Sequence, residues 1–174
     1  LFNTKQISIQ EEMVVKPEEF VKMLKPYAKI IDEVFGIPWR AIIAQAALET
    51  EWLRKPTADL YTGRNSFNLF NIKGEGPAGS VKAYDHEYIR GRSVRVLHEF
   101  RAYHNYEESI EDYARLIAES KRYEPALQVA SDPEEYVRKL QQSGYAQDPS
   151  YADKLIQIMR KYIKDDEDES GIID

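Results

Sequence analysis

The sequence contains no cysteine, which excludes disulfide bonds and any metal site built on thiolate ligands. Its three histidines, His86, His98 and His104, share no spacing typical of metal ligands, so we expect neither a metal nor another cofactor. No apolar run is long enough to cross a bilayer, and we expect no insertion into a membrane. Basic side chains form no stripe along the chain, so a nucleic acid is not an expected partner.

Negative charge is concentrated near one end of the chain. The formal net charge is −6, and residues 165–174 carry six acidic side chains and no basic one, so the remainder is close to neutral. We expect an acidic, disordered tail over residues 164–174. The chain begins with Leu1 and shows no export signal, as a mature chain or an excised domain would.

The length and composition predict a single globular domain. The chain has 174 residues, of which 43% are hydrophobic and 31% are charged, and this is enough to bury a core without disulfides. Residues 1–16 contain no clear hydrophobic period and are expected to be irregular. We therefore place the domain over residues 17–163.

The first two helices are predicted from hydrophobic spacing and from punctuation by proline and glycine. A helical pattern starts at Pro17, is expected to break or restart at Pro26, and ends at Gly36. A second helix opens with Pro38 and covers residues 39–53, with alanine and isoleucine dominating one face. Small side chains permit close helix contacts, so we expect this second helix to be the buried centre of the fold.

The middle of the chain changes character twice. Residues 57–80 are rich in Gly, Asn, Ser and Thr and are expected to form a long ordered loop, anchored by the apolar side chains of Leu60, Phe67, Leu69 and Phe70. Residues 81–103 alternate between apolar and polar side chains on both sides of a turn at residues 90–92, which predicts a β-hairpin.

Helical spacing then returns. Asn105 followed by Glu108 predicts a capped helix start, a short helix is expected around residues 123–130, and Asp132 and Asp148, each followed by proline, predict the starts of two more helices. The expected fold class is α+β, mainly α: six or seven helices around one buried helix, with a small β-lobe over residues 81–103.

Glu49 is the most informative single residue. It follows Ile42 by seven positions, so it shares the apolar face of the predicted central helix, where charged side chains are rare. Desolvation and the negative end of the helix would raise its pKa, and a carboxyl that stays protonated can act as a general acid. Alternatively, Glu49 lies at a frayed helix end or pairs with Arg54. Glu51, rotated about 200° away, is expected to face solvent.

A glycosidase commonly needs a second carboxylate. The candidates outside the helices are Asp85, Glu87 and Glu99. Glu87 lies near the expected hairpin tip among aromatic side chains, which suits contact with sugar rings, but a charge that protects an edge strand from aggregation is the alternative reading.

Four segments together resemble glycoside hydrolase family 73, the endo-β-N-acetylglucosaminidases of peptidoglycan. Residues 44–52 read AQAALETEW and resemble the family's AQAALES-x-W, and residues 68–74 read NLFNIKG and are similar to NLFGIKG. HEY at 86–88 with FRAY at 100–103 and YEES at 106–109 looks like TEY…FR-x-Y…Y-x-x-S, and GYAQDPSYA at 144–152 resembles GYATDPxYA. The resemblance covers about residues 17–163.

This resemblance implies a lysozyme-like helical lobe with a β-hairpin lobe over a substrate groove. It implies that Glu49 is the general acid, that Glu87 is the second carboxylate and that Tyr145 supports the N-acetyl group or its intermediate. By the same resemblance, Asn68 and Phe70 line the groove near the cleaved bond. The implied substrate is the glycan strand of peptidoglycan, met outside the cell or in the cell wall or periplasm by a chain that we expect to be a monomer.

Two departures and two alternatives accompany the resemblance. Thr50 and Glu51 replace small residues after the family's glutamate, and Asn71 replaces the glycine of NLFGIKG, a conformation that Asn tolerates best among other residues. A muramidase or lytic transglycosylase is an alternative on the same fold. A non-catalytic wall-binding module is another, and it would keep aromatic residues of the groove, namely Tyr84, Tyr88, Tyr103, Tyr106 and Tyr145.

Overall fold

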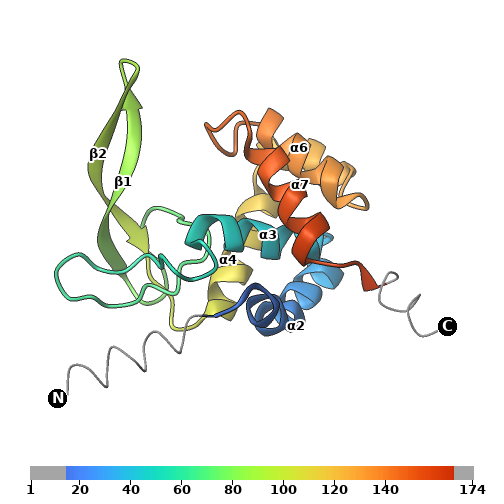
Figure 1. Ribbon diagram of the computed structural model, residues 1–174, viewed down its shortest axis with the longest axis horizontal. Helices are drawn as coiled ribbons and strands as arrows, with labels where there is room; N and C mark the ends of the chain where they lie inside the picture. The colour runs from blue at the N-terminus through green and yellow to red at the C-terminus, as the bar shows by residue number, and fades with distance from the viewer. Residues whose placement is uncertain (1–14, 167–174) are drawn as a thin grey trace.

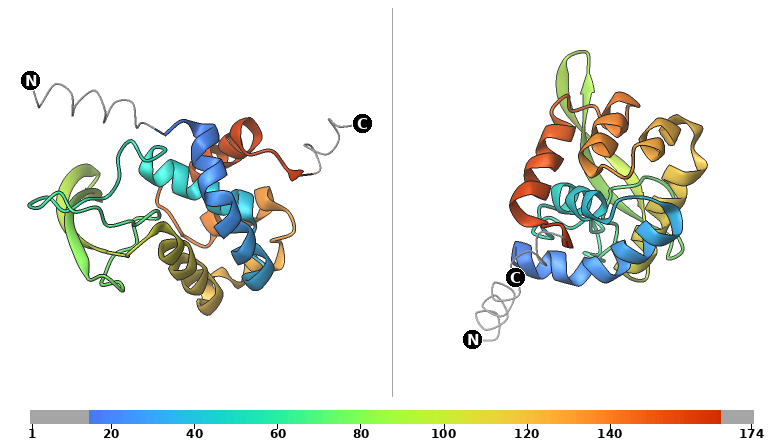
Figure 2. Two further views of the ribbon diagram at one scale, coloured as in Figure 1. Left: turned by 90° about the horizontal axis from the view of Figure 1, so that it is seen from below. Right: turned by 90° about the vertical axis from the view of Figure 1, so that its right-hand side faces the viewer.

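A computed structural model describes residues 15–166 of the chain. Figure 1 shows a cluster of helices and, beside it, a narrow two-stranded ribbon joined to the helices by a long irregular segment. The left-hand view of Figure 2 shows the same separation, and in the right-hand view the tip of the ribbon rises above the helices that lie in front of it. The fold is therefore α+β and mainly helical, as predicted. Most of the expected irregular start and of the expected acidic tail lies outside the described residues.

The first helix, α2 (Pro17–Phe35), has the predicted ends and continues without interruption through Pro26. The expected break at this proline is wrong. Phe20, Leu24, Ala28 and Ile31 lie on one buried stripe that spans both sides of the proline, and burying this stripe outweighs the loss of one helical hydrogen bond. The helix ends at Gly36, which has a φ of 70° and donates its backbone N–H to the carbonyl oxygen of Asp32.

The second helix, α3 (Trp39–Thr50), is the centre of the fold. Every residue from Ala41 to Ala47 is buried, so the helix is enclosed on all sides and packs against α2, α6 and α7. It is shorter than the predicted 39–53, because Glu51, Trp52 and Leu53 all adopt positive φ angles of 48°, 59° and 64°. The Trp52 ring packs edge-on against Phe20 and Tyr162, and this contact fixes the unusual turn.

The later helices surround α3. They are α4 (Tyr106–Glu119), the short 3-10 turn η1 (Lys121–Tyr123), α5 (Glu124–Gln128), α6 (Pro133–Gln142) and α7 (Tyr151–Tyr162). The Asn105 side chain accepts a hydrogen bond from the backbone N–H of Glu108, and the Asp132 side chain caps α6, as predicted. The last helix begins later than predicted, because the Asp148 side chain accepts from Ser150 N in a turn that precedes α7.

The hairpin consists of β1 (Ser80–Ile89) and β2 (Arg92–Arg101), which pair antiparallel and thus confirm the prediction. Arg90 and Gly91 form its two-residue turn with φ angles of 52° and 77°, the left-handed geometry that such tight turns require. Only the base of the hairpin is packed, around Val81, Phe100 and Ala102. The rest of the ribbon is mostly exposed.

The segment between α3 and β1 is irregular but highly hydrogen-bonded. Leu69 and Phe70 are buried as predicted, whereas Leu60 is 47% exposed and does not act as an anchor. The loop is also fixed by Asp59, whose carboxylate accepts hydrogen bonds from the backbone N–H groups of Tyr61, Thr62 and Lys82. Within residues 15–166, no helix combines the length and the apolar character that a membrane span requires.

Candidate active site

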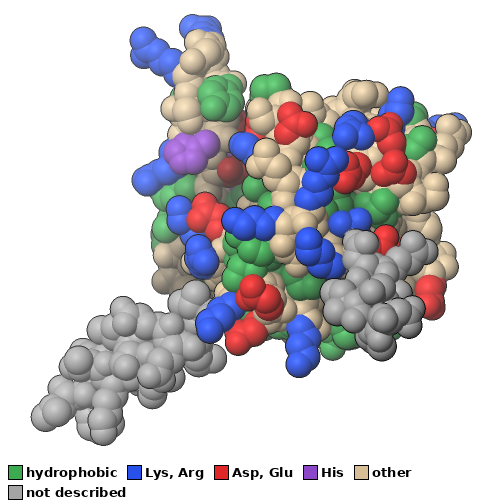
Figure 3. Space-filling model, turned by 45° about the vertical axis from the view of Figure 1, so that its right-hand side comes forward, with side chains coloured by type: hydrophobic (Ala, Val, Ile, Leu, Met, Phe, Trp, Pro, Cys, Tyr) green, Lys and Arg blue, Asp and Glu red, His purple; other side chains and the backbone are tan. Residues whose placement is uncertain are grey.

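A groove of about 580 Å³ lies where the end of α3, the loop at residues 70–73 and the hairpin meet. Figure 3 shows the ribbon standing apart from the helical body on this side of the molecule. One wall is helical and aromatic, and the other is the strand β1. The groove residues are Glu49, Phe70, Asn71, Ile72, Lys73, Asp85, His86, Glu87, Tyr88, Leu116, Tyr123, Tyr145 and Gln147.

Glu49 lies one residue before the end of α3, half-buried in the helical wall of this groove. The Asn71 amide nitrogen donates to the Glu49 side-chain Oε2 over 3.1 Å and to the Glu49 backbone oxygen over 3.2 Å. The Tyr151 hydroxyl lies on another side of the carboxyl, near enough to lower its pKa by hydrogen bonding. Glu49 is therefore not at a frayed end, and it forms no ion pair with the exposed Arg54. Glu51 is exposed and lies 3.6 Å from Lys55, as expected of a surface residue.

The electrostatic surroundings of Glu49 favour its protonated form. Burial raises the pKa of the carboxyl above its usual range, and the negative charge of Asp85 raises it further. The hydrogen bonds from Asn71 and Tyr151 lower the pKa and so oppose part of this rise. The sequence argument placed desolvation first among the causes, and the structure agrees.

A chain of buried polar groups extends from Glu49 into the core. Gln45, one helical turn earlier on α3, is fully buried and donates from Nε2 to the Tyr151 hydroxyl over 3.0 Å. The Tyr113 hydroxyl donates to Gln45 Oε1, and the hydroxyls of Tyr113 and Tyr136 lie 2.8 Å apart. Each buried polar atom of this chain therefore has a partner, as a polar core requires.

The hairpin brings two of the three candidate carboxylates into the groove. Asp85 and Glu87 lie on the same face of β1, since alternate residues of a strand share a face, and both line the groove. Glu99 pairs with Lys82 on the opposite face and does not line it. The carboxylate of Glu87 lies 2.7 Å from His98 Nε2 and 3.6 Å from Lys73 Nζ. The contact with His98 lacks hydrogen-bond geometry, and His98 Nε2 is buried without a hydrogen-bond partner among the described residues.

Tyr145 lies opposite the hairpin in an aromatic wall. Its ring stacks on Tyr151 at a centroid distance of 5.8 Å and meets Tyr113 and Tyr123 edge-on. Burial raises the pKa of the Tyr145 phenol well above its usual value, with contributions from Tyr151 and from the Glu49 carboxyl. The hydroxyl therefore keeps its proton at neutral pH and is able to donate a hydrogen bond.

Asn68 and Phe70 occupy different positions relative to the groove. The Asn68 amide donates to the backbone oxygens of Ile72 and Arg101 and accepts from the N–H groups of Phe70 and Ile72, so its hydrogen bonds serve the loop. Phe70 lines the groove and stacks on Tyr113 at 4.4 Å. A direct contact of Asn68 with substrate stays a prediction.

Asn71 adopts the left-handed conformation, with a φ of 52°, that glycine would adopt most easily. Its side chain also donates a hydrogen bond to Glu49. From the sequence alone, Asn71 is recognisable only as a departure from the glycine of the family motif. Sequence reasoning missed the contributions of Asn71, Gln45 and Tyr151 to this site. The available signal was Gln45, a polar residue in the otherwise apolar run AIIAQAAL, four positions before the acid.

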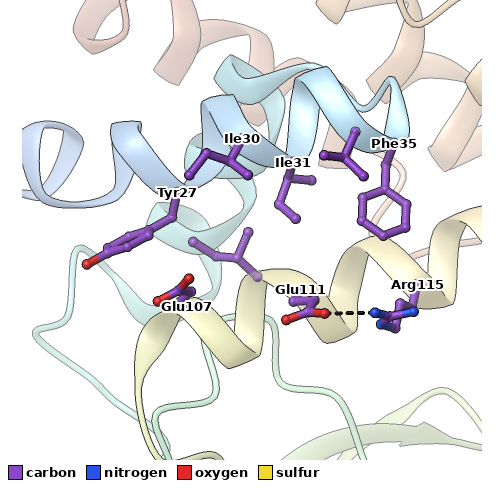
Figure 4. A pocket seen from close by; sticks show the side chains of 9 residues that line it. Tyr27, Ile30, Ile31, Phe35, Glu107, Glu111 and Arg115 are labelled. Carbon is purple, nitrogen blue, oxygen red and sulfur yellow. Dashed lines mark hydrogen bonds and ion pairs between the residues drawn. The ribbon is translucent and has the colours of Figure 1, made fainter.

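Among the described residues, no three His, Cys, Asp or Glu side chains are grouped so that they could hold a metal ion. A separate hollow of about 270 Å³ lies between α2 and α4. Figure 4 shows that it is mostly apolar, with Glu111 and Arg115 paired at 2.8 Å along its edge. This second hollow contains none of the predicted site residues, and two of its three charged side chains, Glu111 and Arg115, pair with each other.

Comparison with known proteins identifies the family. A family model described as mannosyl-glycoprotein endo-beta-N-acetylglucosaminidase matches residues 25–164. The peptidoglycan hydrolase FlgJ of Vibrio parahaemolyticus is 39% identical over 147 residues, which are 83% of this chain and 47% of that protein. The exo-glucosaminidase LytG of Bacillus subtilis is 34% identical over 169 residues, which are 94% of this chain and 58% of that protein. The chain thus spans about half the length of the curated relatives it matches.

A solved structure agrees with these relatives. The C-terminally truncated glycoside hydrolase domain of FlgJ from Salmonella typhimurium superposes with a TM-score of 0.68 at 33% sequence identity, covering 84% of this chain and 97% of that one. The lysozyme-like arrangement expected from the resemblance is confirmed by this likeness. On its sequence and its fold, the chain belongs to the glucosaminidase family, glycoside hydrolase family 73, and is a glycoside hydrolase domain of that family.

Proposed function

We propose that this domain hydrolyses the β-1,4 bond between N-acetylglucosamine and N-acetylmuramic acid in peptidoglycan, leaving N-acetylglucosamine at the new reducing end. The observation that carries the proposal is Glu49, a carboxyl with a raised pKa at the wall of the groove. The printed activities of the relatives, peptidoglycan hydrolase and exo-glucosaminidase, support the substrate. The site of action is then the cell wall or periplasm, and the domain acts as a monomer.

Glu49 acts as the general acid in this proposal. A glycosidic oxygen leaves slowly as an alkoxide, so a proton delivered as the bond breaks lowers the barrier. Burial and the neighbouring Asp85 raise the pKa of the carboxyl and so favour the protonated form that a general acid needs. Its place at the end of an enclosed helix holds the donor still relative to the groove, which is what efficient proton transfer requires.

Glu87 is the proposed second carboxylate, and three routes remain open to it. Carboxyl groups about 6.5–9.5 Å apart leave room for an activated water, whereas about 5 Å suits direct attack and a covalent intermediate. In the third route the substrate's own acetamido oxygen attacks, and the Tyr145 hydroxyl, which keeps its proton, hydrogen-bonds to that group. Because Glu87 is carried on an exposed ribbon, binding of the glycan can change its distance from Glu49.

Substrate contacts are assigned to the lining of the groove. Tyr88 is 72% exposed before any ligand binds and offers apolar surface against which sugar rings pack, whereas Phe70 lines the groove at only 4% exposure and mainly supports its wall. Asn68 contributes either by contact or by holding the loop that carries Phe70. Tyr103 is buried, and Tyr84 does not line the groove but packs against Arg95, so neither is assigned a contact with glycan.

The decisive substitution is Glu49→Gln, with Glu51→Gln as its matched control. Both replace a carboxyl by an amide of the same shape, two residues apart, but Glu51 is exposed and outside the groove. We expect Glu49→Gln to lower the release of soluble fragments from purified peptidoglycan by about 10²–10⁴-fold, the usual weight of general acid catalysis. Glu51→Gln should leave the rate unchanged. Near-normal activity in folded Glu49→Gln would refute the assignment.

The bond that is cut is tested by mass spectrometry of reduced digestion products. Reduced N-acetylglucosamine at the fragment ends supports the proposal. Reduced muramic acid ends would indicate a muramidase, and anhydro ends would indicate a lytic transglycosylase. If the intact domain binds peptidoglycan and releases no fragment, the wall-binding module is the correct reading.

A further inference from the structure

We propose that Asn71 and Tyr151 are positioning residues that hold the Glu49 carboxyl between two hydrogen-bond donors, and that buried Gln45 fixes the Tyr151 hydroxyl as one of these donors. The proposal rests on the proposed role of Glu49 as the acid. It adds a function to three side chains that do not themselves deliver a proton to the substrate.

The Asn71 side of this arrangement is fixed by its own contacts. The Thr57 hydroxyl donates to Asn71 Oδ1, so the amide is oriented with its nitrogen toward Glu49. The same nitrogen donates to the Glu49 backbone oxygen at the exposed end of α3, where helical carbonyls lack partners. Asn71 therefore ties the loop to both the backbone and the side chain of the acid.

The Tyr151 side is fixed by the direction of the buried chain. Gln45 Oε1 accepts from Tyr113, which leaves Gln45 Nε2 as the donor to the Tyr151 oxygen. A hydroxyl has one proton, and when its oxygen already accepts from Gln45, that proton is free to point at Glu49. In the reversed chain, with the Gln45 amide turned over, the Tyr151 proton would point at Gln45 Oε1 instead of Glu49, so the donor role of Tyr151 depends on the amide orientation that the structure has.

The two donors affect catalysis because they favour the product of proton transfer. A hydrogen bond to a carboxylate is stronger than one to a neutral carboxylic acid, so both contacts strengthen as Glu49 gives up its proton. They oppose burial and Asp85 of β1, which disfavour the charged form, while Tyr145 also faces the carboxyl. Burial and Asp85 thus favour the protonated acid at rest, while Asn71 and Tyr151 favour the carboxylate that proton transfer leaves behind.

The test measures the Glu49 titration directly, by ¹³C NMR of the side-chain carboxyl in the whole domain, together with the pH profile of kcat. The variants are Asn71→Gly, which suits a φ of 52°, and Tyr151→Phe. The control is Tyr103→Phe, which removes a buried hydroxyl bonded to Asp112, outside the groove. The Glu49 signal is assigned by its loss in Glu49→Gln.

We expect both variants to move the Glu49 titration and the alkaline limb of kcat to higher pH, because a donor that lowers the pKa has been removed. We also expect kcat at the optimum to fall by about tenfold, the effect of one hydrogen bond to a charged group. Gln45→Met, which removes the donor to Tyr151, should move the titration in the same direction. Tyr103→Phe should leave titration and profile in place.

An unmoved Glu49 titration in both Asn71→Gly and Tyr151→Phe would overturn the positioning proposal. A titration that moves while the pH profile of kcat stays where it was supports the positioning of Glu49 but refutes its role as the acid. The two failures are therefore distinguishable. A tenfold loss of kcat in Tyr103→Phe as well would show that the loss in Tyr151→Phe reports general destabilisation.

Discussion

The two walls of the groove are built in opposite ways. On one side, Glu49 extends from a helix whose residues 41–47 are all buried, and its carboxyl is held by Asn71 and Tyr151. On the other side, Glu87 extends from a two-stranded ribbon that is packed only at its base, and its contacts are Lys73 and His98. Core packing fixes the first carboxyl, whereas two surface contacts orient the second.

This difference suggests a division of labour within the proposed mechanism. Proton donation needs a fixed distance to the leaving oxygen, and a fully packed helix supplies it. The ribbon has many exposed backbone hydrogen bonds and few buried apolar contacts, which are features of segments that open and close at low free-energy cost. A glycan strand can then enter before the second carboxylate approaches.

The largest expected contrast is in stability. Ile43→Ala removes a fully buried side chain from α3 and should lower the free energy of unfolding by about 2–5 kcal/mol. Val94→Ala, on the ribbon at 38% exposure, should change it by less than about 0.5 kcal/mol. Urea denaturation followed by circular dichroism measures both, and equal losses would mean that the ribbon belongs to the same cooperative core.

A smaller effect is expected from Glu49 itself, through the pH dependence of stability. A carboxyl whose pKa is raised on folding binds its proton more tightly in the folded state, so stability falls as pH rises from the unfolded value of 4.5 through the folded pKa. Glu49→Gln should therefore raise the midpoint of thermal unfolding at pH 7 relative to wild type, with a smaller difference at pH 4. A midpoint difference that does not depend on pH would contradict this linkage.

The hairpin turn offers a local perturbation. Gly91→Ala places a side chain at a φ of 77° with open space around it, which should cost about 1 kcal/mol of local strain. We expect faster amide hydrogen exchange along β1 and β2 and a lower rate on peptidoglycan. Gly63→Ala is the matched control, with a φ of 73° and equally open surroundings outside the groove. An equal loss of activity in Gly63→Ala would show that the loss in Gly91→Ala does not arise from the mobility of the ribbon.

The smallest expected change concerns the contacts of Glu87. Lys73→Met removes a partly exposed ion pair of the kind that contributes about 1 kcal/mol or less, so we expect a loss of kcat of only a few-fold. Raising the salt concentration screens this ion pair, so it should lower the kcat of wild type toward that of the variant. A loss as complete as that of Glu49→Gln would mean that Lys73 touches the substrate.

The same contrast explains what the sequence could and could not predict. The central helix and the hairpin follow from local patterns: apolar spacing around Ile42 and alternation on both sides of Gly91. The break expected at Pro26 was wrong, because a local rule was overridden by packing on both sides of the proline. The late start of α7 at Tyr151 likewise depends on a turn that Asp148 stabilises.

For the site, the sequence singled out Glu49, because a carboxyl on an apolar helix face is a local anomaly. It could not show that Asn71, 22 residues later, points its amide at this carboxyl, since that contact depends on how the loop folds back. It favoured Glu87 over Asp85 through neighbouring aromatic residues and the family resemblance, but it could not show that both carboxylates line the groove from one strand face. Long-range contacts are the part that spacing does not encode.

The turn after α3 has a consequence for adapting the domain to higher temperatures. Three consecutive residues there adopt left-handed backbone angles, each at an expected cost of about 1–2 kcal/mol for a side chain other than glycine. Glu51, the first of them, is exposed, so a glycine there offers a direct gain in heat resistance. Because Glu51 lies two residues from Glu49, one substitution there acts on both heat tolerance and turnover.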